Sequence, residues 1–285
     1  NSIIRLYKDY NDHLWIGSVR GGATCVKESY IQTYQDVILN QPTGLTEKAV
    51  TSLYEEENGQ LWIGTDGGGI NLYDPKADKF FHYPMTYGDK VISMTNLSNE
   101  ELLISIYTKG LFVFNKRTKE YKRFVVVDEN TNRRTCFNGY VTLVNEVAND
   151  KIYIIGYEGW IYHTKDKKFT PLVLPEKYQK KVSPLQMSYS DDEFSLLRQG
   201  NVIFMADVKT DSIQILTEAP INETITSITY DKDRRTIWIG TNRGLNYYQR
   251  DEKKFKNFST GLFNTVSYLT LDAQKRLWIS AQNKL

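Results

Sequence analysis

The chain has 285 residues and a formal net charge of +2, which excludes proteins that attract nucleic acid or a membrane surface through bulk charge. It contains 20 Tyr, 12 Phe and 5 Trp but only eight Ala. Because aromatic residues favour strands and Ala is the strongest helix former, this composition predicts an all-β protein. A β architecture built from repeats can use the whole length as one unit.

The ends of the chain and its cysteines give few further constraints. The sequence starts at Asn1 without a basic and apolar leader, and no apolar run approaches the roughly 18 residues needed to span a bilayer. We therefore expect a mature chain or a piece of a longer one. Cys25 and Cys136 lie far apart and lack metal-ligand spacing, so neither a zinc site nor a disulfide framework is predicted.

A short apolar segment recurs along the chain, and it reads Leu-Trp-Ile-Gly at residues 14–17 and 61–64. Related copies end at residues 105, 156, 197, 240 and 280, so successive copies are 40 to 51 residues apart. This is the period of a propeller blade.

The second copy shows the internal order of one blade most clearly. An alternating apolar run at 49–54 is followed by a polar turn containing Asn58-Gly59, which suits a tight hairpin. After the recurring segment come a glycine-rich turn at 65–69, a third apolar run at 70–73 and an aromatic run at 79–83. Four short strands of this kind make one blade.

We therefore predict a β-propeller of four-stranded antiparallel blades, with seven blades when complete. The blades are expected at residues 3–35, 49–83, 91–125, 140–173, 184–217 and 225–258, with a partial blade at 264–285. Since natural sheets avoid exposed edges, the rest of the seventh blade is expected from sequence beyond Leu285.

The recurring Trp and Gly residues are interpreted as structural, because equivalent positions in every repeat usually fill the space between blades. A sugar-stacking role for the Trp side chains is the alternative. Trp160 follows a turn, so a position at the rim with ligand contact is considered for it, but core packing is the favoured interpretation. The predicted structural anchors are Trp15, Gly17, Trp62, Gly64, Trp238, Gly240 and Trp278.

No motif for catalysis, metal binding or cofactor binding is found. The three histidines, His13, His82 and His163, are scattered and lie at no metal-ligand spacing. The triple glycine at 67–69 leads into a strand, whereas phosphate loops lead into a helix. Acidic clusters at 55–57 and 191–193 fall in predicted turns, where such residues serve turn geometry and solvation. We predict no catalytic residue, no metal site and no cofactor.

Ligand contacts are expected on the blade face that carries the second-to-third-strand turns and the connections between blades. The longest connections, at 40–48, 128–139 and 174–183, lie on this face, and long loops on a rigid scaffold usually hold the ligand contacts. Several cations there would suit an anionic ligand, although surface solubility explains them equally well. The candidate ligand-binding residues are Arg20, Arg133, Trp160, Tyr178, Arg198 and Arg243.

The segment at residues 61–74, Leu-Trp-Ile-Gly-Thr followed by glycines and Ile-Asn-Leu-Tyr-Asp, resembles the two-component regulator propeller repeat. Residues 237–248 are a close second copy, and blade five departs most because it lacks both the Trp and the Gly. The resemblance implies the periplasmic sensor region of a hybrid two-component histidine kinase of Bacteroidota. It further implies tandem propellers, a β-sandwich, a transmembrane helix and a cytoplasmic kinase outside this chain.

This resemblance implies a sensor of glycan-derived oligosaccharides that controls polysaccharide-utilisation genes. The fragment is expected to have no enzymatic activity and no nucleic-acid partner, and the full ectodomain is expected to be a homodimer. Two alternatives come from other classes of protein: a propeller glycosidase or polysaccharide lyase, and a scaffold that binds only protein.

Overall fold

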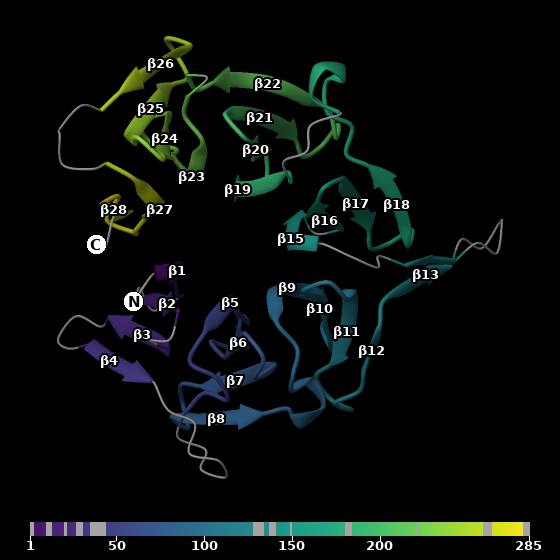
Figure 1. Ribbon diagram of the computed structural model, residues 1–285. Helices are drawn as coiled ribbons and strands as arrows, with labels where there is room; N and C mark the ends of the chain where they lie inside the picture. Colours follow the sequence, from purple (N-terminus) through teal and green to yellow (C-terminus); the bar gives the residue numbers. More distant parts are fainter. Residues whose placement is uncertain are drawn as a thin grey trace. The chain divides into compact units, whose positions relative to one another are not determined.

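The chain folds into a β-propeller, as its repeats predict. A computed structural model describes residues 3–9, 13–19, 22–26, 31–34, 44–127, 134–136, 141–148, 150–179, 184–220, 222–258 and 264–281. Within these ranges six sheets each have four strands paired in chain order (Figure 1). A further sheet has two strands, β27 (Val266–Leu271) and β28 (Leu277–Ala281). The predicted fold class, six blades and part of another, is confirmed.

The first compact unit comprises residues 1–156 and 160–170 and holds blades 1 to 3 and most of blade 4. Blade 1 consists of β1 (Ile3–Lys8), β2 (Leu14–Ser18), β3 (Gly22–Val26) and β4 (Ile31–Tyr34). Blade 2 consists of β5 (Val50–Glu55), β6 (Leu61–Thr65), β7 (Ile70–Asp74) and β8 (Lys79–His82). Blade 3 consists of β9 (Val91–Ser98), β10 (Glu101–Ile106), β11 (Gly110–Asn115) and β12 (Tyr121–Arg123). Blade 4 consists of β15 (Val141–Ala148), β16 (Lys151–Gly156), β17 (Gly159–His163) and β18 (Lys168–Pro171).

The second compact unit comprises residues 157–159 and 171–285 and holds blades 5 and 6 and the two-stranded sheet. Blade 5 consists of β19 (Gln186–Ser190), β20 (Phe194–Gln199), β21 (Val202–Asp207) and β22 (Ile213–Glu218). Blade 6 consists of β23 (Ile225–Asp231), β24 (Thr236–Thr241), β25 (Gly244–Gln249) and β26 (Lys254–Asn257).

The structure adds elements that the sequence analysis treats as connections. β13 (Val125–Val127) and β14 (Arg134–Cys136) form a separate antiparallel hairpin after blade 3. The three consecutive valines of β13 explain this, because β-branched residues favour strands. Two single-turn 3-10 helices, η1 (Pro84–Thr86) and η2 (Glu176–Tyr178), lie in the connections after blades 2 and 4.

The apolar core lies between neighbouring blades of each unit. Trp15 of blade 1 is 3% exposed and packs in one cluster with Val50 and Ile63 of blade 2. Trp62 of blade 2 is 2% exposed and packs with Phe114 of blade 3, at 5.5 Å between ring centroids. Strand β6 is buried at every position, because both faces of its sheet are covered.

The anchor glycines make room for the first strand of the next blade. A Cβ added at Gly64 would lie 2.7 Å from Val91 Cγ1 in β9. A Cβ at Gly240 would lie 2.6 Å from Val266 Cγ1 in β27. Glycine is therefore required here by close approach of a neighbouring strand.

Hydroxyl side chains link the first strands of consecutive blades. Ser93 Oγ in β9 accepts a hydrogen bond from the Val144 N–H at 3.3 Å and donates to the Val144 carbonyl at 3.2 Å. Ser227 Oγ in β23 accepts from the Leu269 N–H at 2.9 Å. These contacts satisfy backbone groups on the open edge of each first strand, which would otherwise lack a partner.

Candidate ligand-binding face

The candidate face of the first unit is built by two turns and the loop between them. Turn 66–69 joins β6 to β7, connection 83–90 leads from β8 to β9, and turn 107–109 joins β10 to β11. These segments belong to the class of loops that the sequence analysis assigns to ligand contact.

The triple-glycine turn of blade 2 is packed between two connections. Gly69 has a φ of +70°, and a Cβ there would lie 2.1 Å from Thr86 Oγ1 in the connection to blade 3. A Cβ at Gly68 would lie 2.6 Å from Thr46 Oγ1 in the connection to blade 2. The close approach of two loops therefore explains these glycines without a phosphate ligand.

Backbone and side-chain contacts join turn 66–69 to the following connection. The Gly67 N–H donates to the Asp89 carbonyl at 3.1 Å, and the Gly88 N–H donates to the Gly67 carbonyl at 2.7 Å. Asp66 and Lys90 form an isolated antiparallel bridge, and their side chains form an ion pair with a 2.6 Å separation. Residues 66–67 and 88–90 consequently form one continuous piece of surface.

A second ion pair holds turn 107–109 to the same connection. The ammonium group of Lys109 binds the carboxylate of Asp89, which is only 5% exposed. Tyr121 donates its hydroxyl to the other carboxylate oxygen at 2.8 Å. Burial and the hydrogen bond to Asp89 raise the pKa of Tyr121 above its ordinary value, so the phenol stays protonated and keeps donating.

Buried asparagines on third strands hold the connections in place, a role that the sequence analysis missed. Asn71 is fully buried, and its Oδ1 accepts the Thr46 backbone N–H at 3.0 Å. In the second unit Asn246 is 1% exposed and donates to Glu223 Oε2 at 3.2 Å, just before β23. A polar residue inside the apolar runs Ile-Asn-Leu-Tyr and Leu-Asn-Tyr-Tyr was the available signal.

The six candidate ligand residues of the sequence analysis are not brought into one described group. Arg20 and Arg133 lie outside the described residues. Arg243 is exposed in the turn between β24 and β25, and its backbone N–H donates to Thr241 Oγ1 at 3.1 Å.

The other three candidates take part in packing. Arg198 lies within β20 rather than in a turn, and its Nη1 donates to the Ile225 carbonyl at the start of blade 6. Trp160 lies in β17 and is half-buried against the core cluster between blades 3 and 4. Tyr178 in η2 is fully buried and donates its hydroxyl to Glu218. The ring of Tyr178 therefore has no face open to a ligand.

The opposite face of the first unit has a cavity of about 470 Å³ between the turns of blades 1 and 2. Two of its three carboxylates, those of Asp9 and Glu55, already have hydrogen-bond partners within the protein. Asp9 Oδ2 accepts from Trp15 Nε1 at 2.9 Å and is 3.0 Å from His13 Nδ1. Glu55 Oε2 accepts from the Tyr7 hydroxyl at 2.8 Å. These acids stabilise the turns between first and second strands.

The contact between Asp9 and Trp15 recurs in other blades. Trp62 Nε1 donates to Glu56 Oε1 at 2.6 Å, and Trp278 Nε1 donates to Asp272 Oδ2 at 2.9 Å. In each case the acid stands six residues before the Trp. We call this contact the tryptophan cap.

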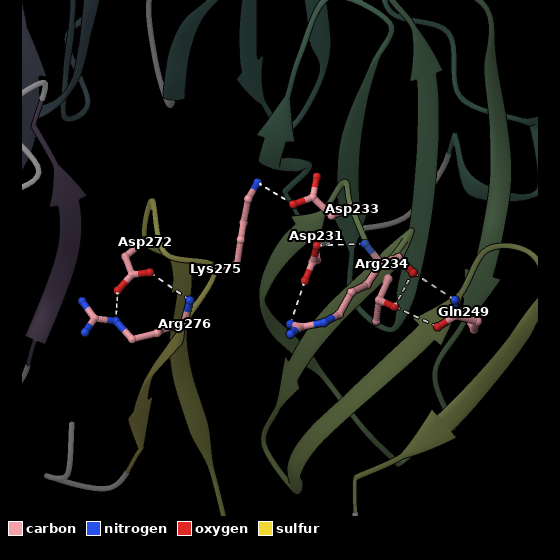
Figure 2. Close-up of polar contacts among 8 residues, drawn as sticks. Asp231, Asp233, Arg234, Gln249, Asp272, Lys275 and Arg276 are labelled. Atoms are coloured by element: carbon pink, nitrogen blue, oxygen red, sulfur yellow. Dashed lines mark hydrogen bonds and ion pairs between the residues drawn. The ribbon is translucent and has the colours of Figure 1, made fainter.

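Blade 6 lacks the tryptophan cap. Trp238 Nε1 is buried and has no acceptor among the described residues. The hairpin of blade 6 is one residue longer than the hairpin of β27 and β28, since Thr229 pairs with Trp238 whereas Thr270 pairs with Trp278. Figure 2 shows that Asp231 binds Arg234 of its own turn, while Asp272 binds Arg276 in the turn between β27 and β28.

Neither a membrane-spanning helix nor a metal-binding cluster is found among the described residues. No helix among them is long and apolar enough to cross a membrane. No group of three or more His, Cys, Asp or Glu side chains in the described ranges is arranged to hold a metal ion.

Comparison with protein families identifies one repeat. Residues 44–67 match the model described as two-component regulator propeller, which confirms the resemblance stated from the sequence. The matched segment includes β5, β6 and the start of the triple-glycine turn. Comparison with curated proteins gives no significant sequence match.

Solved structures with a similar fold include sensor ectodomains and a WD40 propeller. The extracellular domain assigned to the hybrid two-component system BT4673 of B. thetaiotaomicron superposes with a TM-score of 0.75 and 20% identity, covering 98% of this chain and 37% of that one. The corresponding domain of BT3049 gives 0.73 and 16%, covering 99% and 39%. The WD40 propeller of Doa1 gives 0.68 and 12%, covering 98% and 90%. This chain spans less than two-fifths of the two sensor domains, and the likeness establishes the fold.

Proposed function

We propose that this chain is a ligand-sensing propeller from the extracellular region of a hybrid two-component sensor, and that its ligand is an oligosaccharide released from a complex glycan. The observation that carries the proposal is the two-component regulator propeller repeat at residues 44–67. Signalling through an absent histidine kinase would then control genes for polysaccharide use. The sensor ectodomains of similar fold are much longer than this chain, which supports further propeller and β-sandwich domains.

A propeller of this kind senses by binding ligand in one arrangement of the assembly better than in another. We further propose a homodimeric ectodomain on the periplasmic side of the inner membrane, as the resemblance to the sensor family implies. Its transmembrane helix and kinase would lie outside this chain.

One carboxylate of each acidic cluster, Glu56 and Asp191, has structural partners here, which supports a role without catalysis. Glu56 accepts from Trp62 Nε1 at 2.6 Å. Asp191 accepts the N–H groups of Glu193 and Phe194, each at 2.9 Å. Burial raises the pKa of Asp191, but the hydrogen bonds from Phe194 and Glu193 lower it below its ordinary value overall. A carboxylate that is ionised and already accepts hydrogen bonds from the protein is a poor general acid.

Incubation of purified protein with oligosaccharide pools from plant and host glycans tests the proposal. A ligand that binds only the native state raises its stability by about 2.7 kcal/mol at a hundredfold excess over Kd, so a sensor shows a higher melting temperature and no new products. Product formation by a clean preparation would favour a glycosidase or lyase. If no pool raises the melting temperature, the glycan proposal fails and a protein-binding scaffold is favoured.

A further inference from the structure

Six residues on the candidate face of the first unit form an exposed surface, which we call the glycine platform: Asp66, Gly67, Tyr87, Gly88, Lys90 and Tyr107. Tyr87 and Tyr107 are each 46% exposed, although large aromatic side chains are mostly buried in this fold. The Tyr107 N–H donates to the Lys90 carbonyl at 2.9 Å, and the Lys90 ammonium lies 5.7 Å from the centre of the Tyr107 ring.

The glycines of the platform leave its backbone accessible. A Cβ added at Gly67 or Gly88 would meet no atom within 4 Å, in contrast to Gly68 and Gly69 of the same turn. Both residues have positive φ values, +99° and +83°. A ligand can therefore approach the peptide groups at these two positions closely.

We infer that the glycine platform binds a neutral oligosaccharide. This inference rests on the proposed sensing function and names the ligand class and its position. Exposed tyrosine rings can cover the apolar face of a sugar, and a few fixed polar groups beside them can orient its hydroxyls.

The ion pair of the platform retains capacity for sugar hydroxyls. A carboxylate offers about four acceptor sites and an ammonium three donors, so the contact between Asp66 and Lys90 uses only part of both groups. Their side chains are 42% and 37% exposed, which leaves the remaining sites accessible. Neighbouring hydroxyls of a sugar can accept from Lys90 and donate to Asp66 at the same time.

The pairing of Lys90 and Lys109 with carboxylates favours a neutral ligand over a sulfated or uronic one. Lys90 is paired with Asp66, and the adjacent Lys109 is paired with the buried Asp89. An anionic group placed between these pairs would lie near the exposed carboxylate of Asp66 and the buried carboxylate of Asp89, and nearby like charges disfavour binding. The anionic ligand considered in the sequence analysis therefore has no support from these two cations.

The cavity on the opposite face is the competing site, and its chemistry fits a ligand less well. Asp9 and Glu55 in its wall already accept hydrogen bonds from Trp15 and Tyr7. Breaking those contacts would leave the indole N–H of Trp15, a residue only 3% exposed, without its acceptor. The platform requires no such loss.

The test measures binding by calorimetry with two sets of probes. Neutral probes are oligosaccharides from xylan, arabinan, galactan, mannan and β-glucan, and anionic probes are oligogalacturonides and heparin and chondroitin sulfate oligosaccharides. The variants are Tyr107→Ala and Asp66→Ala. Phe81→Ala and Asp150→Ala are matched controls, because Phe81 is 47% exposed on β8 and Asp150 forms a 3.4 Å ion pair with Lys165 in the turns of the opposite face.

We expect a neutral probe to bind, and each platform variant to weaken it by roughly tenfold or more while both controls keep the wild-type affinity. A neutral probe that binds both platform variants as tightly as wild type would overturn the location. Binding of an anionic probe alone would overturn the ligand class. In both cases the sensing proposal survives. If no probe binds, the proposed function fails, and this inference fails with it.

Discussion

Replacing Glu56 by Ala tests whether the tryptophan cap stabilises the fold. The carboxylate of Glu56 accepts from Trp62 Nε1 at 2.6 Å and lies 3.2 Å from the Lys116 ammonium. Trp62 is 2% exposed, so the indole N–H would be left without water or acceptor. A hydrogen bond to a charged acceptor contributes about 1.5–3 kcal/mol, and the partly buried ion pair adds about 0.5 kcal/mol. We expect a loss of roughly 2–3.5 kcal/mol in the free energy of unfolding.

The adjacent Glu57→Ala is the matched control, because Glu57 is exposed and its removal changes the net charge equally. Glu56→Gln keeps a neutral acceptor and should fall between the two. Urea denaturation followed by tryptophan fluorescence measures the free energies, and calorimetry should show a shift of about 2–4 °C per kcal/mol. If Glu56→Ala and Glu57→Ala have the same stability within about 0.5 kcal/mol, the cap contributes nothing and the reasoning fails.

Three further predictions concern the anchors and the caps. Trp238→Phe removes an N–H that has no acceptor among the described residues, so it should change the free energy of unfolding by less than about 1 kcal/mol. Trp62→Phe removes an N–H that donates to Glu56, so it should cost about 1.5–3 kcal/mol in the same urea assay. Equal losses in the two variants would contradict the difference between blades 2 and 6. Gly64→Ala should destabilise the fold by roughly 1–3 kcal/mol, and by more than Gly17→Ala. The reason is that the new Cβ would lie 2.7 Å from Val91 at position 64 but 3.1 Å from Val50 at position 17. Thermal melting gives the order of the two variants, and the reverse order would refute the packing argument. Burial raises the pKa of Asp272, but hydrogen bonds from Trp278 and Arg276 outweigh it and lower the pKa from 3.8 to about 2. The contribution of Asp272 to stability is therefore present above about pH 4 and is lost as the pH falls through about 2. Denaturation curves of Asp272→Asn should lack this part of the acid dependence, and an unchanged acid dependence would be evidence against it.

The blade architecture could be predicted because each repeat carries the same physical requirements. A wide apolar residue fills the gap between blades, and a glycine admits the first strand of the next blade. Trp62 and Gly64 meet both needs in blade 2. Blade 5 lacks both residues, and in this blade Arg198, which was expected in a turn, lies in β20.

The side-chain arrangement on the candidate face could not be predicted, because its contacts join residues far apart in the sequence. Lys109 and Asp89 are 20 positions apart, and their pairing depends on how connection 83–90 folds onto blade 3. Tyr178 was expected in a surface loop, but the 3-10 helix η2 turns its ring into the core.

The packing of two connections against one glycine turn has a mechanical consequence for a sensor. Thr46 on one side and Thr86 on the other contact Gly68 and Gly69, and each connection leads directly into the first strand of a blade. A ligand that displaces this turn by a fraction of an ångström would therefore push on two blades at once, since close-packed interiors transmit small displacements rather than absorb them. A movement of the turn would therefore be passed to both β5 and β9.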